Sequence, residues 1–158
     1  MTLTPNTPPP EFVWTDNFLL GFDPMDRIHQ EFVHCVRALL DAPDDGVKTA
    51  LAAFAEHAER HFTEENNWMR ETQFPPTDCH VDEHTAVLRS VHEVQAALDQ
   101  GAPVALARDL ARELVRWFPG HADYLDSALA HWMSQRRFGG RPVVLKRKLS
   151  PAAGAAEL

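Results

Sequence analysis

The sequence of 158 residues has few of the features that mark secreted or membrane-bound chains. Its two cysteines, Cys35 and Cys79, are too few for a disulfide framework. No apolar run approaches the roughly 18 residues that span a bilayer, which argues against a membrane span. Residues 1–10 show no basic stretch followed by an apolar one, so no secretory signal is indicated. We therefore expect a cytoplasmic protein with reduced thiols.

Strand-like patterns are also nearly absent, and only 141–145 has one. The content of 44% hydrophobic residues fits a single domain that buries its own core. Four amphipathic segments with short connections predict an all-α, up-down-up-down four-helix bundle. We expect a flexible, proline-rich arm over 1–11, the bundle over 12–133, and a basic, flexible tail over 134–158.

The net charge of -8 hides an asymmetry along the chain. Residues 134–158 contain six basic residues and one acid, whereas the rest of the chain contains nine basic and 22 acidic residues. Such a tail suits an acidic partner or an anionic surface. Its Gly, Pro and Ala content favours the simpler interpretation, a solvated tail that folds back on the acidic bundle. We expect no nucleic-acid partner.

Start and stop signals place the four helices. Asp23-Pro24 is a typical start, because an acidic residue and a proline both suit the first turn. Pro75-Pro76 breaks the chain, and Thr77 or Asp78 can cap the next helix. Pro119-Gly120 predicts a kink in the last helix. The expected helices span about 23–39, 45–71, 77–98 and 106–128.

Side chains that ligate metals lie on all four expected helices. His61 and Glu65, like His80 and His84, are four residues apart and therefore share a helix face. Such a core is costly to fold unless metal ions neutralise and satisfy it. A mixture of imidazoles and carboxylates without thiolate favours iron or manganese over structural zinc. The candidate ligands are His29, His61, Glu65, His80, His84, His121 and Asp126.

Spacing leaves two of the assignments open. His121 and Asp126 are five residues apart, about 140° around an ideal helix, so they share a face only if Pro119-Gly120 or a bulge re-aims them. His57 lies four residues before His61, and spacing alone does not decide whether it is a ligand.

Two other motifs give competing interpretations. Glu31 and His34 form an E-x-x-H, but a ferritin-like site needs a second such motif, which we do not find. The stretch from His80 to His84 spells H-x-x-E-H, a zinc-peptidase signature in which Glu83 is the general base. That interpretation leaves the other five candidate ligands unexplained, and we rank it last.

Taken in order, these motifs resemble the hemerythrin and bacteriohemerythrin family. The resemblance rests on His29, the stretch from His61 to Glu65, the stretch from His80 to His84, and the stretch from His121 to Asp126. It extends to Trp14, to the segment from Gly21 to Asp26 before His29, and to Met69, and it covers roughly residues 12–132.

The resemblance implies a non-haem di-iron centre, with an oxo or hydroxo bridge, that binds O2 reversibly for transport, storage or delivery and is not an enzyme. His80, His84 and His121 would hold one iron, and His29 and His61 the other, which keeps a position open for O2. Glu65 and Asp126 would bridge the two ions. The alternative is a sensor of O2, NO or redox state, or an iron-handling module, that acts through a partner.

Two positions depart from the family pattern. Asn66 replaces the acid that commonly follows the bridging glutamate, and we expect a surface change of little consequence. Tyr124, three residues after His121, stands where relatives have an aliphatic residue that lines the oxygen pocket. We hypothesise that its hydroxyl donates a hydrogen bond to bound O2 or NO, and a hydroxyl that faces solvent is the competing interpretation.

Overall fold

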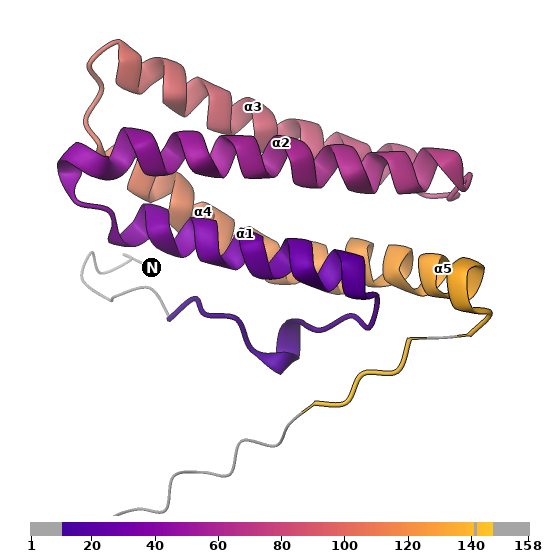
Figure 1. Ribbon diagram of the computed structural model, residues 1–158. Helices are drawn as coiled ribbons and strands as arrows, with labels where there is room; N and C mark the ends of the chain where they lie inside the picture. Colours follow the sequence, from indigo (N-terminus) through magenta and orange to yellow (C-terminus); the bar gives the residue numbers. More distant parts are fainter. Residues whose placement is uncertain (1–10, 141, 147–158) are drawn as a thin grey trace, which may run out of the picture.

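Four helical rods lie side by side in the computed structural model, which describes residues 11–140 and 142–146 (Figure 1). Helix α1 packs against α2 and α4, and α3 also packs between α2 and α4, which is the predicted up-down-up-down order. The all-α prediction is therefore confirmed. The helices are α1 (Asp23–Asp41), α2 (Val47–Glu71), α3 (Thr77–Asp99), α4 (Ala105–His121) and α5 (Ser127–Phe138), and 3-10 turns cover Asp16–Phe18 and Asp44–Gly46.

The chain is fixed in place immediately before α1. The Asp26 carboxylate accepts hydrogen bonds from the backbone N–H groups of Leu20, at 2.8 Å, and Gly21, at 3.0 Å. Gly21 has a φ of 87°, a left-handed conformation that glycine adopts without strain. The predicted start at Asp23-Pro24 is confirmed, and it sets the phase of the helix that carries His29.

The fourth rod is one helix interrupted by a π-helical segment, Ala122–Asp126, between α4 and α5. The N–H of Ser127 donates to the carbonyl of Ala122, five residues earlier, instead of the usual four. This wider turn begins just after Pro119, whose missing N–H already weakens the helix there. The bulge needed to bring His121 and Asp126 to one side is therefore present.

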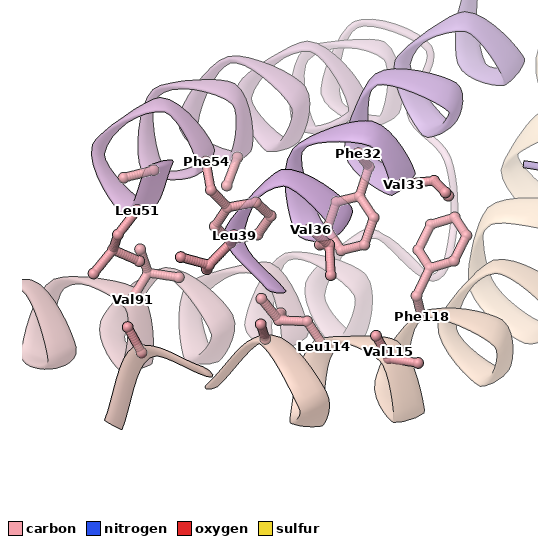
Figure 2. Close-up of a cluster of buried hydrophobic side chains, with 14 of the residues drawn as sticks. Phe32, Val33, Val36, Leu39, Leu51, Phe54, Val91, Leu114, Val115 and Phe118 are labelled. Atoms are coloured by element: carbon pink, nitrogen blue, oxygen red, sulfur yellow. The ribbon is translucent and has the colours of Figure 1, made fainter. Parts of the chain in front are cut away.

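Two hydrophobic cores lie along the bundle, and the candidate ligands lie between them. Figure 2 shows part of the large core, in which Phe32, Leu39, Leu51, Phe54, Val91, Leu114 and Phe118 are buried. The small core contains Phe22, Met25, Trp68, Met69, Phe74, Leu129 and Met133. In α1, for example, Met25 belongs to the small core and Phe32 to the large core, with His29 between them. Apolar packing at both ends therefore holds the polar layer in place.

The tail predicted for 134–158 begins inside a helix. Helix α5 continues to Phe138, and Ser134 is buried. The helix stops because Gly139 adopts a left-handed conformation with φ of 69°. The segment 142–146 forms no strand. Residues 1–10, 141 and 147–158 lie outside the described residues, so the flexible arm and the far part of the tail stay predictions.

The other expectations from composition concern thiols and membranes. Cys35 and Cys79 are both free thiols. Within the described ranges, no helix has the length and apolarity needed to cross a membrane.

Replacing Gly21 by alanine should destabilise the fold. A Cβ at this position would lie 2.6 Å from Cβ of Pro142, and the left-handed backbone would be strained as well. We expect the free energy of unfolding to fall by about 1–3 kcal/mol. In Gly120→Ala, where no atom lies within 4 Å of the new Cβ, we expect a gain of up to about 1 kcal/mol. Urea unfolding of both variants tests this, and equal effects would contradict it.

Candidate metal centre

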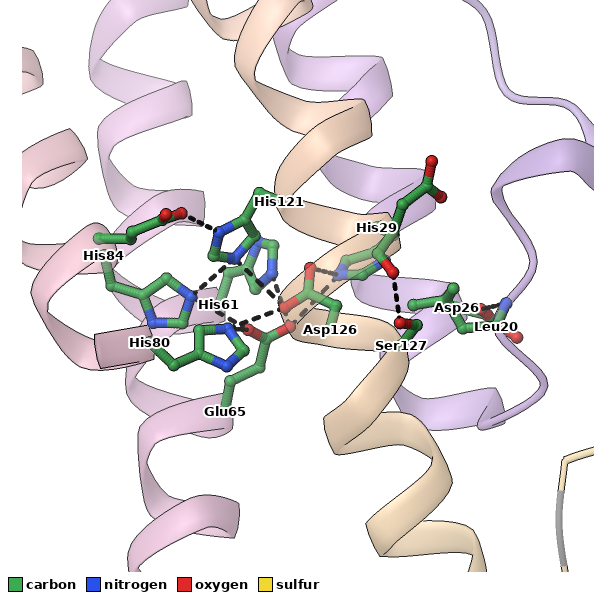
Figure 3. A network of polar contacts seen from close by, with 12 residues as sticks. Leu20, Asp26, His29, His61, Glu65, His80, His84, His121, Asp126 and Ser127 are labelled. Carbon is green, nitrogen blue, oxygen red and sulfur yellow. Dashed lines mark hydrogen bonds and ion pairs between the residues drawn. The ribbon is translucent and has the colours of Figure 1, made fainter. Parts of the chain in front are cut away.

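All seven predicted ligands meet in the layer between the two cores (Figure 3). None of the seven is more than 5% exposed. Their ligand atoms form two groups, each with atoms within 4.8 Å of one another, and Glu65 belongs to both. One group contains Glu65, His80, His84, His121 and Asp126, and the other contains His29, His61 and Glu65.

The two oxygens of Glu65 face different histidines. Its Oε1 lies 2.9 Å from Nε2 of His61 and 3.3 Å from Nε2 of His29. Its Oε2 lies 3.3 Å from Nε2 of His84 and 3.7 Å from Nε2 of His80. One carboxylate thus reaches both a two-histidine set, His29 and His61, and a three-histidine set, His80, His84 and His121.

Asp126, on the fourth rod, also divides its two carboxylate oxygens between the two histidine sets. Its Oδ1 lies 2.9 Å from Nε2 of His80 and 3.2 Å from Nε2 of His121. Its Oδ2 lies 3.1 Å from Nε2 of His29. Two carboxylates that each offer one oxygen to each set have the geometry of bridging ligands between two cations.

Many of these close contacts are not hydrogen bonds. Glu65 Oε2, His80 Nε2 and both oxygens of Asp126 are buried without a hydrogen-bond partner, although each lies near other polar atoms. Leaving such atoms unpaired costs about 1–3 kcal/mol each. The ligands of a metal ion are donor atoms that point at one place without forming hydrogen bonds with one another. These residues therefore fit a pair of cations.

The electrostatics point the same way. Burial alone would lower the pKa of His29, but the carboxylates of Asp126 and Glu65 outweigh it and raise that pKa to about 10. Burial opposes the charged form of Asp126 as well, yet His121 and His29 hold its pKa well below the usual value. Without metal, protons on His29 and His121, whose pKa values the carboxylates raise, supply positive charge beside the two carboxylates. Metal ions would replace those protons.

Aromatic rings enclose the imidazoles. Phe62 stacks on His84, with ring centroids 4.1 Å apart, and Trp117 stacks on His121 at 4.2 Å. Phe118 meets the His29 ring edge-on at 5.2 Å. These residues were not predicted as part of the site, although Trp117 precedes His121 by one helical turn. They fix the orientation of the ligands and place apolar surface against the imidazole rings.

Two polar residues contact the outer ring nitrogens of the three-histidine set. Nδ1–H of His84 donates to Oδ1 of Asn66 at 2.8 Å, and Nδ1–H of His121 donates to Oε2 of Glu83 at 2.6 Å. Asn66 was expected to be a surface change of little consequence, but it is half-buried and contacts a candidate ligand. Glu83 lies on the ring edge of His121 away from the cluster, which does not suit the general base of a zinc peptidase.

The structure answers the open question about His57. This residue is buried, and its ring meets His61 at 5.3 Å, but it belongs to neither group of ligand atoms. Its Nδ1 lies 3.4 Å from Oε2 of Glu31, without a hydrogen bond. Glu31 and His34 line a surface groove between α1 and α2, so the E-x-x-H motif takes no part in the cluster.

The hypothesis about Tyr124 is wrong. Its side chain is 82% exposed, so the hydroxyl does not reach the buried layer. The π-helical turn that brings Asp126 inward changes the rotation between residues 121 and 124, which the prediction had taken from an ordinary α-helix.

His57 should make the protein less stable in acid. Burial, followed by the influence of His61, lowers its pKa from 6.5 to about 3. Below pH 6.5 the unfolded chain takes up a proton that the folded chain refuses, so stability falls with pH until about pH 3, by up to about 1.4 kcal/mol per pH unit. In His57→Leu that contribution disappears. Urea unfolding of both metal-free proteins between pH 7 and pH 4 tests this, and equal slopes would contradict it.

Comparisons with known proteins agree with this geometry. Residues 20–132 match the family model described as "Hemerythrin HHE cation binding domain". The chain is 39% identical over 127 residues to a bacteriohemerythrin of Ralstonia nicotianae, covering 80% of this chain and 92% of that protein. It is 27% identical over 118 residues to a myohemerythrin of Riftia pachyptila, covering 75% and 90%. No solved structure gives a significant match. The resemblance inferred from the motifs is thus confirmed, and the chain belongs to the hemerythrin HHE cation-binding family.

Proposed function

We propose that this protein holds a di-iron centre and binds O2 reversibly, for transport, storage or delivery. The observation that carries the proposal is the position of Glu65 and Asp126, each of which faces both histidine sets with separate oxygens. Membership of the hemerythrin family supports iron as the metal and O2 as the ligand.

In this proposal the seven side chains divide into unequal sets. His80, His84 and His121 would hold one iron, and His29 and His61 would hold the other, with Glu65 and Asp126 as bridging ligands. When bound, the irons would supply the electrons for reversible O2 binding. The two bridging carboxylates offset part of the charge of the ions.

The chain itself supplies rigid ligands and a dry surrounding. His29 and His61 face the large core, where Phe118 lies 5.2 Å from His29 and Phe32 lies 5.9 Å from His61, centroid to centroid. A small apolar molecule such as O2 suits this side of the layer. Excluding water limits the proton leakage that would end reversible binding.

We propose binding without turnover as the activity, and therefore no enzyme. A peptidase would need a base beside the metal, and Glu83 contacts the far nitrogen of His121. A sensor or partner-dependent role rested on Tyr124 and on the basic tail. Tyr124 faces solvent, and the end of the tail, 147–158, is outside the described residues. An acidic partner, NO binding and a cytoplasmic location stay predictions.

The purified protein should contain about two iron ions per chain, one for each ligand group. After anaerobic reduction, an oxygen-dependent visible band should appear with air and disappear under argon over repeated cycles. Metal analysis with visible spectroscopy measures both. A single zinc ion, or a band that never reverses, would contradict the proposal.

Matched substitutions separate a ligand from an ordinary histidine. His61→Gln should lower the iron content to one ion per chain or fewer, because a ligand is lost inside a buried layer. His92→Gln should keep both ions, because His92 is a surface residue that contacts Glu59. Equal iron content in the two variants would count against the assignment of His61.

A further inference from the structure

The outer contacts of the three-histidine set are chemically unequal. His121 donates to the carboxylate of Glu83 at 2.6 Å, and His84 donates to the neutral amide of Asn66 at 2.8 Å. The third ring, His80, has its Nδ1 buried without a hydrogen-bond partner. Of the three imidazoles assigned to one ion, one thus donates to a charged acceptor, one donates to a neutral acceptor, and one has no acceptor.

This difference between the acceptors matters because it changes how strongly each ring donates electrons to a metal ion. A carboxylate that accepts the outer N–H draws the proton away and makes the inner nitrogen a stronger donor. An amide oxygen carries no net charge and does so more weakly. A stronger donor favours the more oxidised state of the ion.

Glu83 is placed to act on His121 without supporting the core. It lies on α3 next to His84 in the sequence, and its contact reaches across to the end of α4. Its side chain is 47% exposed, so replacing the carboxylate by an amide leaves no buried charge unpaired. Asn66 projects from α2, immediately after Glu65, and its contact spans 18 residues to α3.

We propose that Glu83 and Asn66 are positioning residues that set the reduction potential of the metal centre in opposite directions. This inference rests on the proposed di-iron function. The carboxylate of Glu83 strengthens His121 and favours the ferric state. The neutral amide of Asn66 leaves His84 a weaker donor than a carboxylate would, and favours the ferrous state that binds O2.

The test measures the potential of the iron-loaded protein by spectroscopic titration. In Glu83→Gln we expect the ratio of ferric to ferrous centres at a fixed potential to fall about tenfold, equivalent to 59 mV for one electron. In Asn66→Asp we expect a rise of similar size. The double variant should return toward the wild-type value, because the two changes oppose each other.

Matched controls separate this effect from a general change in charge. Glu59→Gln removes a carboxylate from the surface residue His92, a contact of 2.8 Å, and Asn67→Asp adds a charge one residue from Asn66. Both should change the ratio less than twofold. Iron content and circular dichroism are measured first for every variant.

The outcomes are distinct. Opposite shifts in Glu83→Gln and Asn66→Asp, larger than in their controls, support the inference. Shifts in the same direction, or no larger than in the controls, overturn it while the di-iron function stands. If Glu83→Gln folds but loses iron, a rise in the ratio of ferric to ferrous centres in Asn66→Asp supports the inference, and a fall or no change overturns it. A wild-type protein without iron overturns the proposed function and this inference with it.

Discussion

The rest of the structure depends on charge neutralisation within a dry layer. Five imidazoles and two carboxylates are buried together, and the carboxylates stay ionised only because positive charge lies beside them. Protons on His29 and His121 supply that charge in the metal-free chain, and several buried atoms are left without hydrogen bonds. Two cations satisfy the same atoms directly, so metal binding and the stability of the native fold are coupled.

The bundle tolerates such a layer because apolar packing bounds it on both sides. The large core joins all four rods, and the small core joins the opposite ends of α1, α2 and α5. Rings from the same helices also stack on the ligands, as Phe62 does on His84 and Trp117 on His121. The side chains that stabilise the fold therefore also orient the site.

Much of the fold and of the metal centre was predictable from the sequence. Apolar periodicity gave four helices, and the start at Asp23-Pro24 and the restart at Thr77 follow from local backbone preferences. The spacing of five between His121 and Asp126 indicated that an ordinary helix was insufficient.

Contacts between distant helices were not predictable, since nothing near Glu83 in the sequence identifies His121 as its partner. Tyr124 was misplaced because the rotation of the π-helical turn has no clear sequence signal. The boundary at 134 followed charge, whereas the helix ends where Gly139 permits it.

The π-helical segment has a consequence for how this rod tolerates changes in length. Asp126, Leu129 and Met133 lie on one inward stripe, and that stripe is out of step with the one that Leu114 and Phe118 form before the wide turn. The wide turn absorbs one extra residue, so deleting a residue between 122 and 125 would restore an ordinary α-helical turn and leave the downstream stripe facing inward. Asp126 and the residues of the small core on α5 would keep their inward positions. The five residues 122–126 thus let the fourth rod hold one residue more than a regular helix while the stretches before and after it both keep their buried faces.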